Sequence, residues 1–412
     1  MGKKFRVFGD VVQEYYIDVD ADSRDEAWYA AEKLPKEEWV KLPDRNKGNK
    51  IEPYNIEELS TAVKVNKKKV KSDGVENILQ NLSEDSDESV RGSVAANPNT
   101  DAKILKILSE DEDEFVRGYV AANPNTDSKI LKILSEDEED SVREMFARNP
   151  KTQPEVLKSL AKEAENIRCN LAMNPSLTPQ LMLALSKDPV SFVRRNVARN
   201  PILSEKILET LSVDKADDVR EAVAGNPNTS VKVLKLLSQD KENDLDEAVA
   251  GNPNSTPEIL DSLSKDASSN VRASVAGNPS TSVKTLGVLS KDQNGYVRGE
   301  VAGNPNSPQE ILTHFSQDKD EFVNRGIGRN PNTSTQTLFV LSKHKDRYVR
   351  ASVAQNPRIT ADITDALSKD KDDYVRRMVA ENPSTSFEIL LTLSKDDSAE
   401  VRASVAGNPL LS

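Results

Sequence analysis

Residues 207–229 read ILETLSVDKADDVREAVAGNPNT, and variants of this stretch fill most of the chain. The Asn-Pro dipeptide near its end occurs thirteen times at this place in the unit, with the asparagine at 97, 123, 149, 174, 200, 226, 252, 278, 304, 330, 356, 382 and 408. Eleven of the twelve intervals are 26 residues, and the interval from Asn149 to Asn174 is 25. So strict a period indicates a repeat protein, in which each unit has an apolar face that only its neighbours cover.

Each unit reads approximately ILxxLSxDxxxxVRxxVAxNPxT, which predicts a first helix over the Val-Arg stretch. Asp188 suits the N-cap of such a helix and Pro189 its first turn, and Asp111 with Glu114 has the spacing of a capping box. The helix should end at Asn-Pro, because proline disfavours helical geometry in the residue before it and has no backbone N–H.

A second helix follows a few residues later. Thr178-Pro179 and Thr256-Pro257 each place a capping threonine before a proline, which is a helix-start signal. The apolar residues that follow, such as Ile259, Leu260 and Leu263, have helical spacing. The repeats therefore predict a mainly α fold, an α-solenoid of about thirteen two-helix units.

The first 74 residues lack the repeat. Phe5 to Val19 is rich in β-branched and aromatic residues, with Gly9-Asp10 as the expected hairpin turn, and a helix-like stretch follows from Ala27 to Leu34. We predict a small α+β module, a β-hairpin plus a helix. The expected organisation is this module at residues 1–62, a basic linker at 63–74 and the helical repeat solenoid at 75–412.

Composition narrows the classes of partner. The 56 basic and 68 acidic side chains leave a formal charge of −12, and residues 1–74 hold 15 of each sign, so the excess negative charge lies in the repeats. This charge argues against a general affinity for nucleic acid or anionic lipid. With no run of about eighteen apolar residues and no apolar leader, the expectation is a soluble cytoplasmic protein that binds no membrane.

The motif VRxxVAxNP, as in Val219 to Pro227, followed by a short leucine-bearing helix, resembles the leucine-rich repeat variant family over about residues 75–412. The resemblance implies a right-handed superhelix of two helical layers, one α and the other partly 3₁₀. Members of that family can carry a cysteine-ligated iron–sulfur module before the repeats, but the N-terminal region here contains no cysteine. The Asp-then-Arg spacing is also similar to that of HEAT repeats, and the N-terminal module is weakly similar to DpnD/PcfM-like domains.

The recurrent polar residues favour structure over catalysis. An aspartate and, six positions later, an arginine each occur in eleven of the thirteen units. One catalytic site needs groups in differing environments, which a motif present in every unit does not supply. We interpret the pair as an N-cap and an ion-pair ladder, and the Asn of Asn-Pro as a partner for backbone groups of adjacent units. His314, His344 and the single Cys169 have no ligand-spaced partners, so no enzyme activity, metal or cofactor is expected.

The residues one, two and five positions after the arginine vary between units. In most units they are small, as in Gly92, Ser93 and Ala96, which predicts that this layer is the inner, concave one. Two stretches carry larger side chains of the kind enriched at interfaces. These candidate partner-binding residues are Met145, Arg148, Asn170, Met173, Arg195, Asn196 and Arg199 in the first cluster, and Arg325, Arg329, Gln355, Arg377 and Met378 in the second cluster.

The leading functional hypothesis is a non-catalytic scaffold that binds a protein partner through its concave inner face. The alternative is a nucleic-acid-binding solenoid that uses the arginine clusters and the lysine-rich run from Lys64 to Lys71. An enzyme in the N-terminal module has no recognisable catalytic constellation to support it. The oligomeric state stays open. We also expect an elongated particle, with a kink near residues 160–168, where one residue is deleted and the usual aspartate is missing.

Overall fold

The computed structural model describes residues 3–10, 15–21, 40–41, 52–59, 78–240, 245–315 and 318–411, with only the backbone described before residue 78. The chain divides into two compact units, Met1–Val75 and Glu76–Ser412. Each unit is described by itself.

The first unit contains a four-stranded antiparallel sheet. β1 (Lys3–Asp10) pairs with β2 (Tyr15–Ala21) on one side and with β4 (Glu52–Leu59) on the other, and β3 (Val40–Lys41) pairs with β2. The strand order is β3-β2-β1-β4. Gly9 lies opposite Tyr15 and Asp10 opposite Glu52, so both belong to β1, and the predicted turn at Gly9-Asp10 is wrong. The predicted helix from Ala27 to Leu34 and the linker at 63–74 lie outside the described residues.

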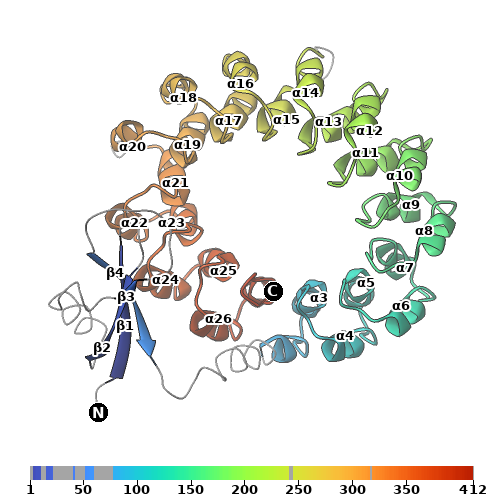
Figure 1. Ribbon diagram of the computed structural model, residues 1–412, viewed down its shortest axis with the longest axis horizontal. Helices are drawn as coiled ribbons and strands as arrows, with labels where there is room; N and C mark the ends of the chain where they lie inside the picture. The colour runs from blue at the N-terminus through green and yellow to red at the C-terminus, as the bar shows by residue number, and fades with distance from the viewer. Residues whose placement is uncertain are drawn as a thin grey trace. The chain divides into compact units, whose positions relative to one another are not determined.

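The second unit is built from two layers of short helices. Figure 1 shows that the first helix of each repeat lies in the inner layer. The small side chains of the first helices predict this arrangement. The first helices are α3 (Glu88–Ala96), α5 (Glu114–Ala122), α7 (Asp140–Phe146), α9 (Glu165–Leu171), α11 (Ser191–Arg199), α13 (Asp217–Gly225), α15 (Asp246–Gly251), α17 (Ser269–Gly277), α19 (Gly295–Gly303), α21 (Glu321–Arg329), α23 (Arg347–Ala354), α25 (Asp373–Glu381) and α27 (Ala399–Ala406).

The second helices form the outer layer, and all of them are α-helical in the described residues, so the partly 3₁₀ layer that the resemblance implies is not found there. A helical stretch at residues 78–82 precedes the labelled helices of this layer. The others are α4 (Ala102–Leu108), α6 (Ser128–Leu134), α8 (Pro154–Leu160), α10 (Pro179–Leu185), α12 (Glu205–Leu211), α14 (Val231–Leu237), α16 (Pro257–Leu263), α18 (Val283–Leu289), α20 (Gln309–Phe315), α22 (Thr335–Leu341), α24 (Ala361–Ser368) and α26 (Phe387–Leu393).

The helix ends correct one prediction and confirm another. α11 begins at Ser191, after Val190, so Asp188 is not its N-cap; the Asp188 carboxylate accepts a hydrogen bond from the backbone N–H of Val190 in the turn before the helix. Glu114 likewise is the first residue of α5, and Asp113 caps that helix, so the predicted capping box with Asp111 is wrong. The threonine caps of the second helices are confirmed, since Thr256 accepts from the backbone N–H of Ile259.

The apolar core lies between the two layers. In the unit quoted first, Val219 and Val223 of α13 are fully buried, and so are Leu208 and Leu211 of α12. The same valine and leucine positions are buried around the array, which places the two apolar stripes of each unit face to face. Every unit thus buries its apolar surface against its own partner helix and its neighbours, as a repeat array requires.

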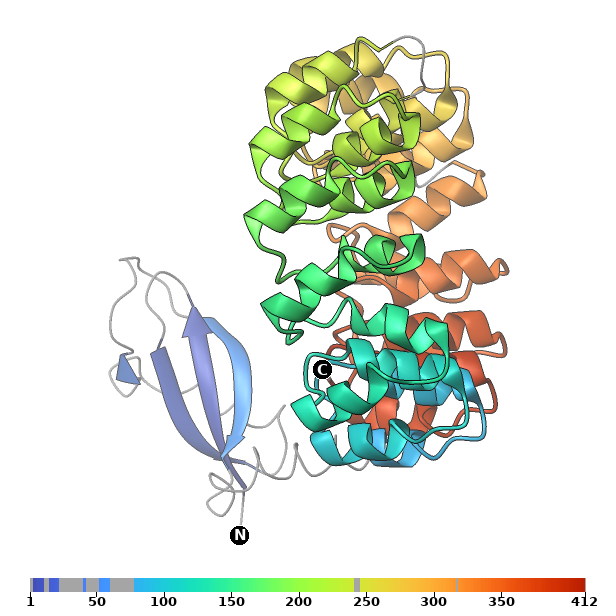
Figure 2. The same ribbon diagram turned by 90° about the vertical axis from the view of Figure 1, so that its right-hand side faces the viewer.

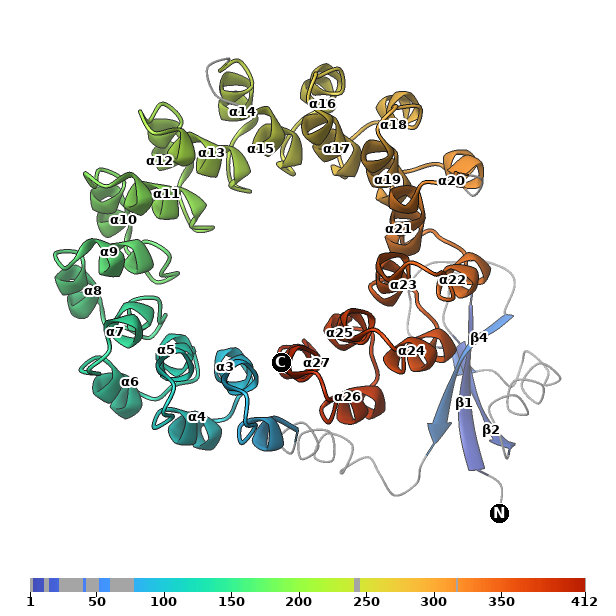
Figure 3. The ribbon, with the colours of Figure 1, turned by 180° about the vertical axis from the view of Figure 1, so that it is seen from behind.

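The array closes into a ring, which the sequence does not predict. α27 at the end of the chain packs against α3 near its start, and Figures 1 and 3 show the two helices side by side. The prediction of an elongated particle is therefore wrong for the repeat array, which closes on itself. Figures 1 and 2 together show the helices lying roughly along the axis of the ring.

The shortened unit does not change the start of its first helix. α9 begins three residues before Arg168, as α11 does before Arg194, and its N-cap Ala164 makes no side-chain capping bond, like the N-caps of α11 and α13. α9 spans seven residues where α11 and α13 span nine, because it ends two residues earlier relative to its arginine. The predicted change at the start of this helix is therefore wrong. The kink itself, a change in the rotation between units, stays a prediction.

Candidate binding surface

Ion pairs between neighbouring units form a ladder around the ring. In nine rungs the arginine donates from Nε to the aspartate twenty residues later, as Arg350 does to Asp370 from Nε and Nη2 at 2.7 and 2.9 Å, and in the tenth Arg402 pairs with Asp85. The Nη1 of Arg350 also donates to backbone carbonyl oxygens of its own turn, such as that of His344. Ten rungs of this kind occur in the described residues, which confirms the predicted ladder and assigns these residues to structure.

Three positions interrupt the ladder because the sequence departs from the motif there. Glu163 stands where Arg143 needs an aspartate, and Arg143 pairs with Asp140 of its own helix. Asp246 replaces an arginine opposite Asp266. At the third interruption both partners change, to Asn324 and His344, and the His344 Nδ1 accepts from the backbone N–H of Asp346.

A second ladder runs through the core without interruption in the described repeats. The amide of Asn226 donates to the carbonyl oxygens of Ala198 and Asn200 in the preceding unit, at 2.6 and 3.1 Å. The equivalent asparagine donates to the corresponding alanine carbonyl oxygen at all thirteen positions, with Gly328 in place of alanine once. The predicted role of this asparagine, to satisfy backbone groups at helix ends, is confirmed.

The first cluster of candidate residues lies on α7, α9 and α11 and in the turns that follow α7 and α9, on the opposite side of the ring from the second cluster (Figure 1). Arg148 Nε donates to Asn170 Oδ1 at 2.6 Å, and Asn196 donates to the carbonyl oxygen of Cys169 at 2.9 Å. Arg195 lies over the ring of Phe192 and 4.0 Å from Asp218. Met145 is half-buried, whereas Met173 and Arg199 are exposed.

The second cluster lies on α21, α23 and α25, and one of its members is not accessible. Met378 is only 3% exposed, and its sulfur accepts a hydrogen bond from Gln355 Nε2 at 2.9 Å. Met378 is therefore a packing residue, and its prediction as a partner contact is wrong. Arg325 and Arg377 are half-buried, and Arg329 and Gln355 are exposed on the same inner layer.

Sequence reasoning missed a row of aromatic side chains beside the second cluster. Four successive first helices carry an aromatic residue directly before the first valine, and we call Tyr296, Phe322, Tyr348 and Tyr374 the aromatic row. The rings of Tyr296, Phe322 and Tyr348 are 41%, 45% and 38% exposed. The signal was present in the sequence, because these four residues recur at the 26-residue period.

Direct contacts link the members of the row. Tyr296 meets Phe322 edge to face with 5.7 Å between ring centroids, and Tyr348 meets Tyr374 in the same way at 5.4 Å. The guanidinium of Arg325 lies between the two pairs, 5.0 Å from the Phe322 ring and 4.5 Å from the Tyr348 ring. The row is thus one continuous stack in which a cation bridges two aromatic pairs.

Glycines allow the helices under the row to approach closely. A Cβ atom on Gly326 of α21 would lie 2.0 Å from the carbonyl oxygen of Gly299, and one on Gly299 of α19 would lie 2.6 Å from that of Phe322. Only glycine fits at such separations. The close packing of α19 and α21 brings Tyr296 and Phe322 together.

A cavity of about 220 Å³ lies along the aromatic row. The rings of the row line it together with the small residues Gly299, Ala351 and Ser352 and the longer side chains of Glu300, Arg329 and Gln355. Its lining therefore combines aromatic and polar side chains.

The arginines of the second cluster are paired with carboxylates. Arg329 lies 2.6 Å from Glu300, and Arg377 lies 2.9 Å from Glu381. Arg325 lies 3.4 Å from Asp346. The hydrogen bond from Arg377 to Glu381 raises the pKa of the arginine further. These carboxylates neutralise most of the positive charge on the inner surface at the second cluster.

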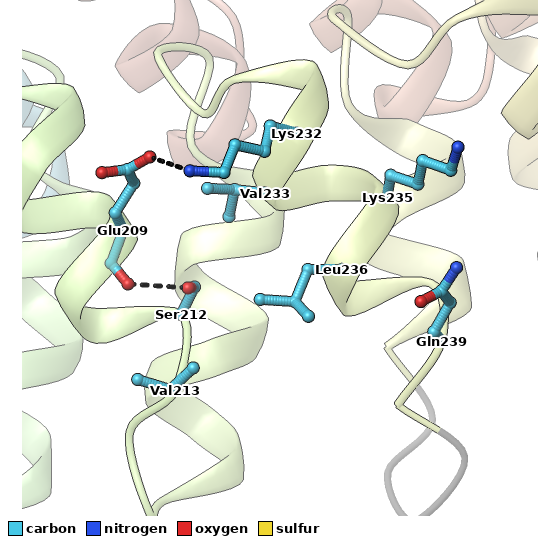
Figure 4. A pocket seen from close by; sticks show the side chains of 8 residues that line it. All are labelled: Glu209, Ser212, Val213, Lys232, Val233, Lys235, Leu236 and Gln239. Atoms are coloured by element: carbon cyan, nitrogen blue, oxygen red, sulfur yellow. Dashed lines mark hydrogen bonds and ion pairs between the residues drawn. The ribbon is translucent and has the colours of Figure 1, made fainter.

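The outer layer has its own groove between α12 and α14, shown in Figure 4. It has a volume of about 440 Å³, and the exposed side chains of Val213 and Leu236 line it. Lys232 reaches across to Glu209 at 3.0 Å. Lys235 and Gln239 point to the other side of α14, where a second groove of about 480 Å³ continues toward α16.

In the described part of the chain, no cluster of three or more His, Cys, Asp or Glu residues has metal-binding geometry. Cys169 is half-buried, and burial raises the pKa of its thiol. No described helix is long and apolar enough to span a membrane.

These features define a helical repeat protein with paired polar ladders and a variable inner surface. No family model and no curated protein matches the chain. Solved structures similar to it include a leucine-rich repeat variant, described as having a novel repetitive structural motif, with 23% identity over 66% of this chain and 87% of that chain and a TM-score of 0.25. The family that the repeat motif resembles is thus represented among them.

Two further solved structures are other helical repeat proteins. Importin beta is 12% identical over 80% of this chain and 49% of its own, with a TM-score of 0.21. A designed armadillo repeat protein in complex with the peptide (KR)4 is 12% identical over 82% of this chain and 99% of its own, with a TM-score of 0.10. These TM-scores are too low to carry a binding site from any of these proteins to this chain.

Proposed function

We propose that this chain is a non-catalytic repeat scaffold that binds a protein partner on the inner face of its ring. The observation that carries the proposal is the contrast within the inner layer. The ladder residues recur in nearly every unit and are engaged in holding units together, whereas the two clusters and the aromatic row occur in a few units and are partly exposed. Exposed aromatic and arginine side chains are typical of protein interfaces.

Charge favours a protein over a nucleic acid. Binding to a polyanion requires unneutralised cations that displace its counterions. Arg195, Arg325, Arg329 and Arg377 already have carboxylate neighbours, and the repeats as a whole carry the excess negative charge. A protein segment does not require unneutralised positive charge, because aromatic contacts and hydrogen bonds can hold it.

A capture experiment from the native host tests the proposal. The full-length chain is compared with a variant in which Arg148, Arg195 and Arg199 are changed to Glu, and with a second variant in which Arg325, Arg329 and Arg377 are changed to Glu. The matched control changes three exposed lysines of the outer layer, Lys103, Lys235 and Lys284, to Glu. We expect one inner-face variant to lose a specific protein that the control retains. Equal retention by all variants would contradict the inner-face assignment.

Oligonucleotide binding, measured by fluorescence anisotropy at several salt concentrations, tests the alternative. We expect weak binding at all of them. Submicromolar affinity that falls linearly with log salt, and is lost on changing Arg148, Arg195 and Arg199, would instead establish a nucleic-acid-binding solenoid.

We further propose that residues 1–62 form an α+β module that provides a second contact, joined to the repeats by a basic linker at 63–74. The division between the two units after Val75 supports this organisation. Capture with residues 75–412 alone should retain the inner-face partner and lose any partner of the module. Identical sets of partners would contradict the second contact.

A further inference from the structure

We propose that the aromatic row binds a proline-rich segment in the polyproline II conformation. This inference rests on the proposed function, because it specifies the chemistry of the polypeptide that the inner face holds. Its basis is the juxtaposition of four partly exposed rings on successive helices with a small cavity lined in part by polar side chains.

The length of the row fits a short extended segment. The contacts along the row, from Tyr296 through Arg325 to Tyr374, place its two outermost rings no more than about 21 Å apart. A polyproline II helix rises about 3.1 Å per residue with three residues per turn. About seven residues of such a helix would therefore cover the row.

The chemistry of the cavity lining fits the same ligand. Aromatic rings pack well against the pyrrolidine rings of proline, and aromatic-lined grooves are a known means of binding such segments. A polyproline II backbone has no internal hydrogen bonds, so its carbonyl oxygens need donors, while proline offers no N–H in return. The Ser352 hydroxyl already donates to the carbonyl oxygen of Tyr348, and one N–H of Gln355 donates to the sulfur of Met378. The donors that the cavity offers are therefore the second N–H of the Gln355 amide and the phenol of Tyr296, whose pKa is raised by burial.

Charge argues against the other extended ligands. A basic peptide would bring its cations against Arg325, at the centre of the row. An acidic peptide or a single-stranded nucleic acid would have to compete with Asp346 and Glu300, which already pair with Arg325 and Arg329. A neutral ligand meets neither obstacle, and a preformed polyproline II helix loses little conformational entropy on binding.

The test uses the full-length chain and fluorescein-labelled nona-proline, with a Gly-Ser nonapeptide, an acidic nonapeptide, a basic nonapeptide and a nine-nucleotide oligothymidine as comparison probes. We expect measurable anisotropy change with nona-proline and at least tenfold weaker binding of the others. Tyr348→Ala and, separately, Tyr374→Ala should each weaken nona-proline binding at least tenfold.

Phe115→Ala is the matched control, because Phe115 occupies the same position in α5, is 63% exposed and lies outside the row. Its binding should equal that of the wild type, and circular dichroism should show that all three variants remain folded. No nona-proline binding at millimolar peptide, or equal losses in Phe115→Ala and Tyr348→Ala, would overturn the inference.

The outcomes separate this inference from the proposed function. If another peptide binds better than nona-proline and its binding is lost in Tyr348→Ala, the polyproline assignment is wrong but the inner face remains a protein-binding surface. If the oligothymidine binds best at the row, both are wrong. If the arginine variants described above all retain the native partner while nona-proline binds the row, the proposed inner-face function is contradicted and the polyproline assignment of the row stands.

Discussion

Arg402 of α27 donates two hydrogen bonds, of 2.6 and 2.9 Å, to the carboxylate of Asp85, which lies 317 residues earlier in the chain. The amide of Asn97 likewise donates to the carbonyl oxygen of Ala406 at 2.6 Å. Both contacts repeat those at the other junctions between units. The first and last helices therefore meet as ordinary neighbours, without a covalent connection between them.

Replacing Arg402 by alanine should destabilise the ring as much as removing an internal rung. The change leaves the Asp85 carboxylate, 12% exposed, without its guanidinium, and losing one partner of a largely buried pair costs about 1–3 kcal/mol. Urea unfolding of Arg402→Ala and of Arg350→Ala should give similar losses in the free energy of unfolding. An unchanged stability in Arg402→Ala alone would mean that the array is open in solution.

Two glycine substitutions should have opposite effects. Gly326→Ala forces a methyl group against the carbonyl oxygen of Gly299, and overpacking of this kind costs about 1–3 kcal/mol or more. Gly225→Ala, at the end of α13, meets nothing within 4 Å and should be neutral or stabilising by up to about 1 kcal/mol. Thermal unfolding of both variants checks this, and equal melting temperatures would contradict the close approach of α19 and α21.

Asn226→Ala should lower stability without removing partner binding. The substitution leaves the buried carbonyl oxygens of Ala198 and Asn200 without their donor, at a cost of about 1–3 kcal/mol. Asn228→Ala is the control, because Asn228 is exposed and its amide donates to the carbonyl oxygen of Pro201 at the surface. A variant with normal melting temperature and no partner binding would assign a functional role to the asparagine ladder.

Low pH should unfold the ring, because it protonates the paired aspartate carboxylates. Hydrogen bonds from Arg402, Arg117 and Arg272 hold the pKa values of Asp85, Asp137 and Asp292 below the ordinary range. A depressed pKa in the folded state contributes stability that is present above the unfolded-state pKa, near about 4, and is lost as pH falls through the folded-state value.

We therefore expect a nearly constant melting temperature from about pH 7 to pH 5 and a steep fall below about pH 4. Circular dichroism melts across this range measure it. The melting temperature of Arg402→Ala should fall less on acidification than that of the wild type, because one ion pair of the ladder is already absent in the variant. A melting temperature that falls mainly between pH 8 and pH 6 would contradict the assignment of the acid sensitivity to the paired aspartates.

The inner-face site was only partly predictable from the sequence. The arginines of both clusters stand out because they replace small residues at fixed positions of the repeat, and the structure places them on the inner layer. Met378 also replaces a small residue at one of these positions, but it is buried. Whether a side chain there reaches the surface depends on how closely the neighbouring helix packs. The aromatic row has a clear period, yet its continuity comes from Arg325, which bridges rings of two different units.

The sequence by itself determined the two-helix unit, the number of units and the roles of the ladder residues, because helix periodicity, caps and Asn-Pro act within one repeat. Only the tertiary structure decided that the array closes. A closed ring of thirteen units needs a rotation of roughly 28° at each junction, and small differences in how helices pack add up around the array. Close approaches such as that of Gly299 and Gly326 set these rotations, and they belong to the contact between two units, which no single repeat encodes.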